Sequence, residues 1–406
     1  MLHILIRILL FASLGGLCGC TVFLVLVLIS ALRFRALKKR SVGDVREYPL
    51  ASLLKPLCGL EARLESNLES FFSQDYPRFE IVFGLRNKYD PALAVVHRVS
   101  RRYPDVPIAV VLAGEPDRPN AKVCSLEKMV AAAKSDYLVI SDSDVHVSPN
   151  YLKDVVCPLL SPQVGLVTCL YRGVPTDGIW ARLEALGMSV EMTSGVLVAD
   201  LLEGMKFALG PTMATRRDVL DAVGGMGVLV DYCADDYVLG KKVAELGRTV
   251  VLSSHIIDHV VLNDNWKASI LHQVRWMRST RFSRPAGHIG SGLTFAMPFG
   301  ILGMAAGIAL HHGAWAAALL GAALLNRVLM SIVAGWGVVG DDLALRDCWL
   351  YPVRDLMGFC FWIASFLGTT IVWRNQRYRL EKEGRMVLLA DPSASDTGTV
   401  AVDSLA

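Results

Sequence analysis

Hydrophobic and polar residues are distributed very unevenly along this chain. The first 25-residue stretch without a charge, Ile8–Leu32, is long enough to cross a lipid bilayer as a helix. It is too long for a signal-peptide core, and no small-residue cleavage pattern ends it. By the positive-inside rule, the basic flank that follows is expected on the cytoplasmic side, and it consists of Arg33, Arg35, Lys38, Lys39 and Arg40. We predict an N-terminal transmembrane helix with its flank over residues 1–40.

Between about Ser52 and Val261, short apolar runs alternate with stretches of helical period. This alternation is typical of an α/β domain with a mainly parallel sheet. We therefore predict a cytoplasmic α/β domain over residues 45–262, with a longer amphipathic stretch at 178–199. The predicted strands lie near 51–55, 79–85, 108–112, 137–142, 164–170, 207–214 and 249–253. The predicted helices lie near 61–73, 91–102, 122–134, 150–160, 216–223 and 235–246.

The pattern predicts a further helix from Asn265 to Phe282. It combines apolar and aromatic residues with arginines, at Trp266, Ile270, Arg275, Trp276, Arg278, Arg281 and Arg284. Aromatic and arginine side chains suit the lipid headgroup layer. We predict an interfacial amphipathic helix over residues 263–284.

Residues 285–380 are predicted to form a C-terminal membrane block. No charged residue occurs from 285 to 326, and the polar interruption at 311–313 predicts a hairpin between two apolar helices. Further apolar blocks cover 328–340 and 356–373. The second of these blocks is followed by Arg374, Arg377 and Arg379. Residues 390–406 are rich in Ser, Asp, Thr and Ala, which predicts a disordered tail.

The number of membrane crossings is constrained by parity. If the α/β domain and the basic end at 374–379 are both cytoplasmic, the later blocks cross an even number of times, and two is the simplest count. One block would then be interfacial or re-entrant. Charged residues make either of two blocks a candidate, because Arg327 lies in one and Arg354-Asp355 at the edge of the other.

The bulk composition agrees with a membrane protein. Apolar residues make up 53% of the chain and the mean hydropathy is +0.42. The net charge of only +3 gives no case for nucleic acid as a partner. The nine cysteines have no paired C-x-x-C spacing, so neither a zinc site nor a disulfide framework is indicated.

The strongest candidate for chemistry is the strand-like run Tyr137–Ser141, which leads directly into Asp142-Ser143-Asp144. Side chains alternate in an extended chain, so Asp142 and Asp144 project to one side. Ligands of open α/β sheets bind outside the carboxyl ends of the strands. Two carboxylates there favour a divalent ion such as Mg²⁺, although a solvated acidic turn is the alternative.

Two further features could contribute to a nucleotide site. Asp90 follows the second predicted strand and precedes Pro91, so it fits a helix cap, and it also fits a carboxylate that binds a nucleotide base. Lys122 opens a predicted helix, where an ammonium group suits a phosphate. A solvated lysine is the alternative.

Two more features lie later in the chain. Asp235 and Asp236 begin a helix; they fit either an N-cap or a general base in which one carboxylate raises the pKa of the other. His272, Arg275 and Trp276 share one helix face. Arg275 could neutralise a diphosphate and Trp276 could stack on a sugar or lipid head, whereas membrane anchoring is the alternative.

Taken in order, Asp90, Asp142-x-Asp144, Asp236 and Arg275-Trp276 resemble the D, DxD, D, (Q/R)xxRW pattern of family 2-type glycosyltransferases with the GT-A fold. The sequence is more similar to ceramide glucosyltransferases and their bacterial relatives, which include glycosyltransferases of hopanoid biosynthesis. The resemblance covers about residues 45–380. Supporting segments are Leu53-Leu-Lys-Pro-Leu57, Asn67-Leu-Glu-Ser-Phe-Phe72, Asp75-Tyr-Pro77, Asp90-Pro-Ala92, Val164-Gly-Leu-Val167, Arg217-Asp-Val-Leu220, Gly224-Gly225 and Arg377-Tyr-Arg-Leu380.

The resemblance implies a role for each matching position. Asp90 would contact the uracil of a UDP-sugar, and Asp142 and Asp144 would hold Mg²⁺ or Mn²⁺ against the diphosphate. Asp236 would be the catalytic base, with Asp235 where relatives often carry Glu. Arg275 and Trp276 would close the donor and acceptor site.

One position departs from the family pattern, because His272 stands where relatives carry Gln or Arg and Gln273 is out of register. His272 would then contact the diphosphate or the acceptor. The departure favours the bacterial branch, where the acceptor is a hopanoid polyol rather than ceramide.

We therefore expect a multi-pass membrane glycosyltransferase that moves a hexosyl group, glucose or N-acetylglucosamine, from a UDP-sugar to a lipid hydroxyl with inversion. One alternative is a processive polysaccharide synthase, for which three or four apolar blocks are few. The other is a non-catalytic membrane scaffold that binds nucleotide-sugars, for which a base at Asp236 has no use.

Overall fold

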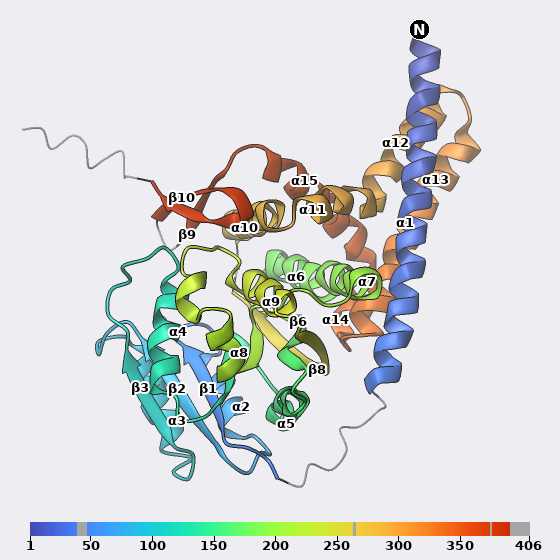
Figure 1. The fold of residues 1–406 in the computed structure, drawn as a ribbon. Coiled ribbons are helices and arrows are strands. Elements are labelled where there is room, and N and C mark those ends of the chain that lie inside the picture. The colour runs from blue at the N-terminus through green and yellow to red at the C-terminus, as the bar shows by residue number, and fades with distance from the viewer. Residues whose placement is uncertain (39–46, 263–264, 374–375, 390–406) are drawn as a thin grey trace, which may run out of the picture.

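The computed structural model describes residues 1–38, 47–262, 265–373 and 376–389 (Figure 1). Some parts of the sequence-based predictions lie outside these residues: Lys39, Arg40, residues 45–46 of the α/β domain, residues 263–264 of the interfacial helix, Arg374 and the tail from Ala390.

The α/β domain is built on a sheet that contains eight strands within the described residues (Figure 1). The sheet is mainly parallel, as predicted, and only β7 and β5 of these strands run antiparallel to their neighbours. β1, β2, β3 and β4 are parallel to one another, as are β6 and β8. In spatial order the strands are β3 (Ile108–Leu112), β2 (Phe79–Leu85), β1 (Ala51–Pro56), β4 (Tyr137–Ser141), β7 (Thr212–Arg216), β6 (Val164–Pro175), β8 (Thr249–Val261) and β5 (Val145–His146).

Helices cover the sheet at the predicted positions, with bounds that differ by a few residues. They are α2 (Leu64–Phe72), α3 (Ala92–Ser100), α4 (Ala121–Ala132), α5 (Tyr151–Val156), α8 (Arg217–Ala222) and α9 (Asp235–Glu245). The strand predicted at 207–214 is displaced to β7, and the two-residue strand β5 was not predicted, because so short a segment has no readable period.

The predicted amphipathic stretch is a continuous helical run of α6 (Gly178–Leu186), the π-helical turn η2 (Gly187–Met192) and α7 (Thr193–Glu203). It is long and apolar enough to cross a membrane, yet 67% of its most apolar window is buried inside the protein. One side packs on β6 and the other on α1 and α15. The run therefore lies between the sheet and the remaining apolar helices.

Helix α1 (Leu2–Lys38) joins the apolar helices to the α/β domain (Figure 1). Its 37 residues extend for about 55 Å, well beyond a hydrocarbon core of about 30 Å. Near its start, the Ser13 hydroxyl donates to the carbonyl of Phe299 at 2.7 Å. Near its end, Ala31 and Phe34 belong to the core of the α/β domain. Only part of the predicted apolar stretch is therefore free to contact lipid.

The predicted hairpin is formed by α12 (Ala296–Ala309) and α13 (Gly313–Met330), and His311 turns the chain with φ 57°. The apolar block at 328–340 is not a separate element, since η5 (Ser331–Trp336) continues α13. Before the hairpin, α11 (Pro285–Ser291) and the following turn meet α12 at a bend of 47°. Among the described residues, three helices are long and apolar enough to cross a membrane, or up to four if this bent pair is one span.

The block predicted at 356–373 is not one helix. Following the short helix α14 (Asp342–Arg346), α15 (Tyr351–Phe366) has 16 residues, or about 24 Å, and then gives way to a small antiparallel sheet. That sheet consists of β9 (Thr370–Trp373), β10 (Gln376–Leu380) and β11 (Met386–Leu388). α15 exposes apolar residues such as Leu356 and Ile363 and buries Arg354 and Asp355.

The two charged positions that marked separate blocks in the sequence form one buried ion pair. Arg327 Nη1 lies 2.8 Å from Asp355 Oδ1, and both side chains are at most 3% exposed. The second oxygen of Asp355 accepts the backbone N–H of Met297 at 2.9 Å. These contacts join α12, α13 and α15.

Helix α10 (Trp266–Ser283) confirms the helix predicted after the α/β domain. Two of its arginines bind the carboxyl end of α15 and the turn after it: Arg278 donates to the carbonyls of Thr370 and Leu367, at 2.5 and 3.0 Å, and Arg281 donates to that of Gly368 at 2.9 Å. Cationic side chains are favourable at the carboxyl end of a helix. These two arginines therefore have protein partners. An interfacial position for α10 stays a prediction.

Candidate active site

The Asp142–Asp144 turn follows β4 at the carboxyl edge of the parallel strands, where ligands of such sheets bind. Lys55 of β1 donates a hydrogen bond to the carbonyl of Asp142 at 2.5 Å and so fixes the turn. Its side chain is fully buried, and its ammonium nitrogen lies 3.6 Å from the centre of the Phe71 ring. Burial lowers the pKa of Lys55 to about 7, although the charges of Asp142 and Asp144 act in the opposite direction. The turn thus has a fixed basic support that the sequence analysis did not identify.

Each carboxylate of the turn has its own basic partner. Lys122 Nζ lies 2.6 Å from Asp142 Oδ1, and His259 Nε2 lies 3.2 Å from Asp144 Oδ2. Burial raises the pKa of Asp142, against the attraction of Lys122. Burial also opposes ionisation of Asp144, but His259, Lys55 and Lys122 together hold its pKa below the usual value. The alternative of a solvated acidic turn is therefore wrong.

Glu61 adds a third carboxyl group to this edge of the sheet, from the loop after β1. Burial raises the pKa of Glu61, and the nearby charges of Asp144 and Asp142 raise it further. One oxygen of Glu61 and Oδ1 of Asp144 are buried without a hydrogen-bond partner in the described structure.

The first turn of α9 supplies Asp235 and Asp236. Asp236 accepts the backbone N–H groups of Gly210 and Tyr237, at 2.7 and 2.8 Å. Burial, followed by the charge of Asp235, raises the pKa of Asp236 to about 6. Asp235 is buried, and its Oδ2 atom has no hydrogen-bond partner among the residues that the structure describes. The residue at the N-cap position is Ala234, so simple N-capping does not explain this pair.

Lys122 lies between the two acidic pairs. It belongs to the first turn of α4, whose N-cap Asn120 accepts the N–H of Val123 and donates to Asp235 at 3.3 Å. Burial acts to lower the pKa of Lys122, but Asp142 and then Asp235 more than offset this and raise it. The solvated-lysine alternative is therefore wrong.

Asp90 holds local structure in the position that the sequence indicated. Its carboxylate accepts the N–H of Ala92 at the start of α3 at 2.9 Å, which confirms the helix-capping interpretation. It also accepts the N–H of Gly59 at 3.1 Å, in the same loop that carries Glu61. Contact with a nucleotide base stays a prediction.

The three predicted residues of α10 face the α/β domain. His272 Nδ1 lies 2.7 Å from Glu184, which is 1% exposed, and the His272 ring is 4.5 Å from that of Trp276. Glu184 also acts electrostatically on His259, the partner of Asp144. The guanidinium carbon of Arg275 lies 5.6 Å from the centre of the Trp373 ring. The charge of Arg275 also acts on the thiol of Cys233, as do the charges of Asp235 and Asp236.

In this arrangement, buried carboxyl groups outnumber the basic side chains. Five carboxyl groups, from Glu61, Asp142, Asp144, Asp235 and Asp236, gather around Lys55, Lys122 and His259. Within the described residues, no three His, Cys, Asp or Glu side chains are already arranged to hold a metal. The partnerless oxygen of Asp144 and the surplus of carboxylates nevertheless fit a hard divalent cation, which prefers oxygen ligands.

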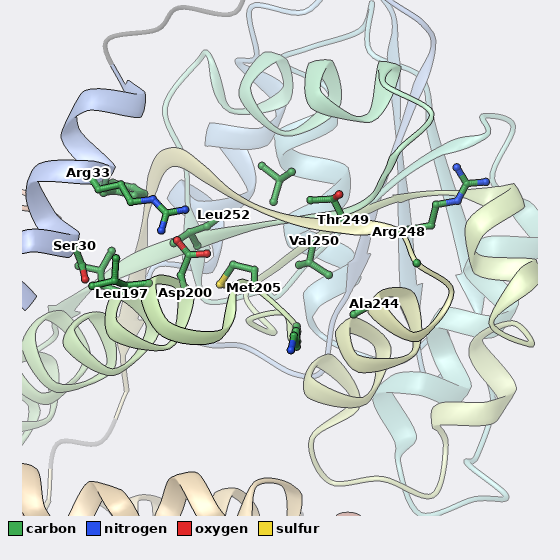
Figure 2. Close-up of a pocket in the computed structure, with 16 residues that line it drawn as sticks. Ser30, Arg33, Leu197, Asp200, Met205, Ala244, Arg248, Thr249, Val250 and Leu252 are labelled. Carbon is green, nitrogen blue, oxygen red and sulfur yellow. The ribbon is translucent and has the colours of Figure 1, made fainter. Parts of the chain in front are cut away.

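A cavity of about 530 Å³ lies elsewhere, between the end of α1, α7 and β8 (Figure 2). Its lining includes Arg33, Asp200 and Arg248 but none of the five carboxyl groups described above. The cavity is therefore separate from the candidate active site.

Sequence reasoning missed Lys55, Glu61, Glu184 and His259. Glu61 had a usable signal, since it follows the strand adjacent to β4 and strand ends are where ligands bind. The other three are polar residues within largely apolar segments, with no motif around them that marks a site. Only the packing of β1, α6 and β8 brings them to the site.

The fold is that of the GT-A class. A mannosyltransferase of Pyrobaculum calidifontis, whose structure was determined with GDP-mannose and Mn²⁺, matches this chain with a TM-score of 0.52 and 19% identity, over 90% of this chain and 98% of that one. At this identity the match shows the fold alone.

The family follows from the sequence comparison. The model of glycosyl transferase family 21 matches residues 19–386, and the chain belongs to that family. Ceramide glucosyltransferase 1 of Caenorhabditis elegans is 25% identical over 393 residues, which are 92% of this chain and 81% of that protein. A ceramide glucosyltransferase of Komagataella phaffii is 39% identical over 106 residues, 25% of this chain and 21% of that protein. The chain is thus a glycosyltransferase.

Proposed function

We propose that this enzyme transfers a hexosyl group from a UDP-sugar to the hydroxyl of a membrane lipid, with inversion at the anomeric carbon. The observation that carries the proposal is the gathering of buried carboxyl groups from two elements, the end of β4 and the start of α9, around the ammonium group of Lys122. One pair is suited to bind a cation and diphosphate, and the other to accept a proton.

Asp142 and Asp144 are the residues that would hold Mg²⁺ or Mn²⁺. When bound there, the metal supplies positive charge against the negative charge that develops on the leaving UDP. Arg275, whose charge acts on Cys233 as do those of Asp235 and Asp236, would add a further positive charge against the diphosphate.

Asp236 is the proposed base. A base is most effective when its pKa lies near the working pH, and the pKa of Asp236 is raised to about 6. The backbone N–H groups of Gly210 and Tyr237 fix its carboxylate, so it meets the lipid hydroxyl in one orientation. Asp236 takes the hydroxyl proton as the lipid oxygen attacks the anomeric carbon and the bond to UDP breaks.

The membrane attachment supports a lipid acceptor. We propose that α1, the bent pair of α11 and α12, and α13 cross the bilayer with the α/β domain on the cytoplasmic side, and that α15 lies at the interface. α15 is shorter than the hydrocarbon core and exposes apolar residues while it buries Arg354 and Asp355. It packs against α10, so it would bring lipid close to His272 and Trp276.

The test is release of UDP by the purified full-length protein in detergent. UDP-glucose and UDP-N-acetylglucosamine are each combined with ceramide or a hopanoid polyol, with and without Mg²⁺ or Mn²⁺. We expect metal-dependent release with one donor–acceptor pair and a product that carries one sugar. A polymeric product would indicate a processive synthase, and UDP-sugar binding without release from any pair would indicate a scaffold.

A further inference from the structure

Lys122 occupies a position that conflicts with a metal ion on Asp142. Its ammonium nitrogen is 2.6 Å from Asp142 Oδ1, and its side chain is only 15% exposed. A divalent cation that binds this carboxylate would bring like charge against the ammonium group in a buried setting, where electrostatic repulsion is strong. The two cations therefore compete for one carboxylate.

The carboxylates around Lys122 stabilise its ammonium group in this position when no sugar donor is bound. Asp142, Asp235 and Asp236 all act on its charge. These carboxylates belong to two different elements, the end of β4 and the first turn of α9. A single cation between them offsets their mutual repulsion and holds the two halves of the site together.

A diphosphate would change this balance. It brings negative charge to the site, where the ammonium group of Lys122, in the first turn of α4, can bind a phosphate oxygen. The long, flexible lysine side chain can move from Asp142 to a phosphate oxygen without any backbone movement. Asp142 is then released for the metal.

We propose that Lys122 is a built-in counter-ion that excludes the free divalent metal from Asp142 and releases that carboxylate only when the nucleotide diphosphate binds. Metal and nucleotide therefore bind with positive coupling, and Lys122 is a positioning residue that creates part of it. This inference rests on the proposed metal-dependent function. It adds that Asp142 becomes free for the metal only when the nucleotide diphosphate binds.

The test measures Mn²⁺ binding to the full-length protein in detergent by electron paramagnetic resonance, with and without UDP and without any sugar transfer. In the wild type we expect UDP to tighten Mn²⁺ binding by about tenfold or more, within the usual range for coupled sites. Lys122→Met has nearly the same length and no charge. It should bind Mn²⁺ about tenfold more tightly than the wild type without UDP, and the coupling should shrink to about twofold.

Two variants serve as controls. Lys134→Met removes an exposed lysine just beyond the other end of α4, 4.0 Å from Glu80, and should leave both Mn²⁺ affinities unchanged. Lys122→Arg keeps the positive charge and should keep most of the coupling. It also keeps the proposal testable if Lys122→Met does not fold.

The outcomes separate the inference from the proposed function. If the wild type binds Mn²⁺ with UDP but Lys122→Met shows the same affinities and coupling, the role of Lys122 is wrong and the metal site stands. Equal loss of coupling in Lys122→Arg and Lys122→Met also overturns the counter-ion role. If the wild type binds no Mn²⁺ even with UDP, the metal-dependent function itself is overturned.

Discussion

Two groups of buried charges in this protein differ in how well they are balanced. In the membrane block, Arg327 and Asp355 pair at 2.8 Å, and backbone groups satisfy the second oxygen of Asp355 and one donor of Arg327. In the candidate active site, carboxyl groups outnumber the basic side chains, and oxygens of Glu61, Asp144 and Asp235 have no partner in the described structure. Balanced charges join helices, whereas unbalanced ones are suited to receive a charged ligand.

The largest effect is expected when the proposed base, Asp236, is removed from the candidate active site. Asp236→Asn should lower sugar transfer by about 10²–10⁴-fold, the usual contribution of a general base, while UDP-sugar binding changes little. Initial rates and calorimetric binding measure the two effects. Asp221→Asn, an exposed carboxylate on α8, is the matched control and should keep the wild-type rate. Transfer by Asp236→Asn at the wild-type rate would refute the assignment.

The balanced pair is broken by Arg327→Met. This variant leaves Asp355 buried without its cation, so we expect a loss of about 3–5 kcal/mol in stability, measured by thermal unfolding in detergent. The double variant Arg327→Met/Asp355→Leu should recover much of that loss, because no buried charge is left unpaired. Arg346→Met, 72% exposed, should change stability by less than about 0.5 kcal/mol. No recovery in the double variant would show that the pair is more than a balanced contact.

The pH dependence of kcat/KM tests how the neighbouring carboxyl groups affect the pKa of Asp236. Because burial and Asp235 raise the pKa of Asp236 to about 6, the ionised base is lost as the pH falls through that value. We expect kcat/KM to fall about tenfold per pH unit below it. Asp235→Asn removes a charge that raises the pKa of Asp236, so the acidic limb of its profile should move to lower pH. A limb that stays in place would mean that another group controls it.

The smallest of the expected effects concerns the arginines of α10. If Arg278 mainly binds the carbonyls after α15, Arg278→Met should lower stability by about 1–3 kcal/mol and leave binding to lipid vesicles unchanged. The exposed Arg377→Met is the control and should leave stability unaltered. Weaker vesicle binding with unaltered stability in Arg278→Met would instead support the anchoring role that the sequence suggested.

The sequence by itself determined most of the elements and the centre of the site. Strand and helix periods located β1 to β4, the helices of the α/β domain and the apolar hairpin, because these patterns depend on local spacing. The position of Asp142 and Asp144 directly after a buried strand indicated a ligand site, because the carboxyl edge of such a sheet is open. The sequence also showed that His272 departs from the family pattern, but it did not show that Glu184 is the partner of His272.

The tertiary structure alone decided which charges meet. Lys122 and Asp142 are separated by 20 residues and His259 and Asp144 by 115. Their pairing depends on how α4 packs against β1 and β2 and on the pairing of β8 with β5, which follows Asp144 directly. It also decided that Arg327 and Asp355 join two apolar blocks, that the block at 328–340 continues α13, and that α15 ends after 16 residues. Burial and long-range approach set these outcomes, and neither is encoded in the local hydrophobic period.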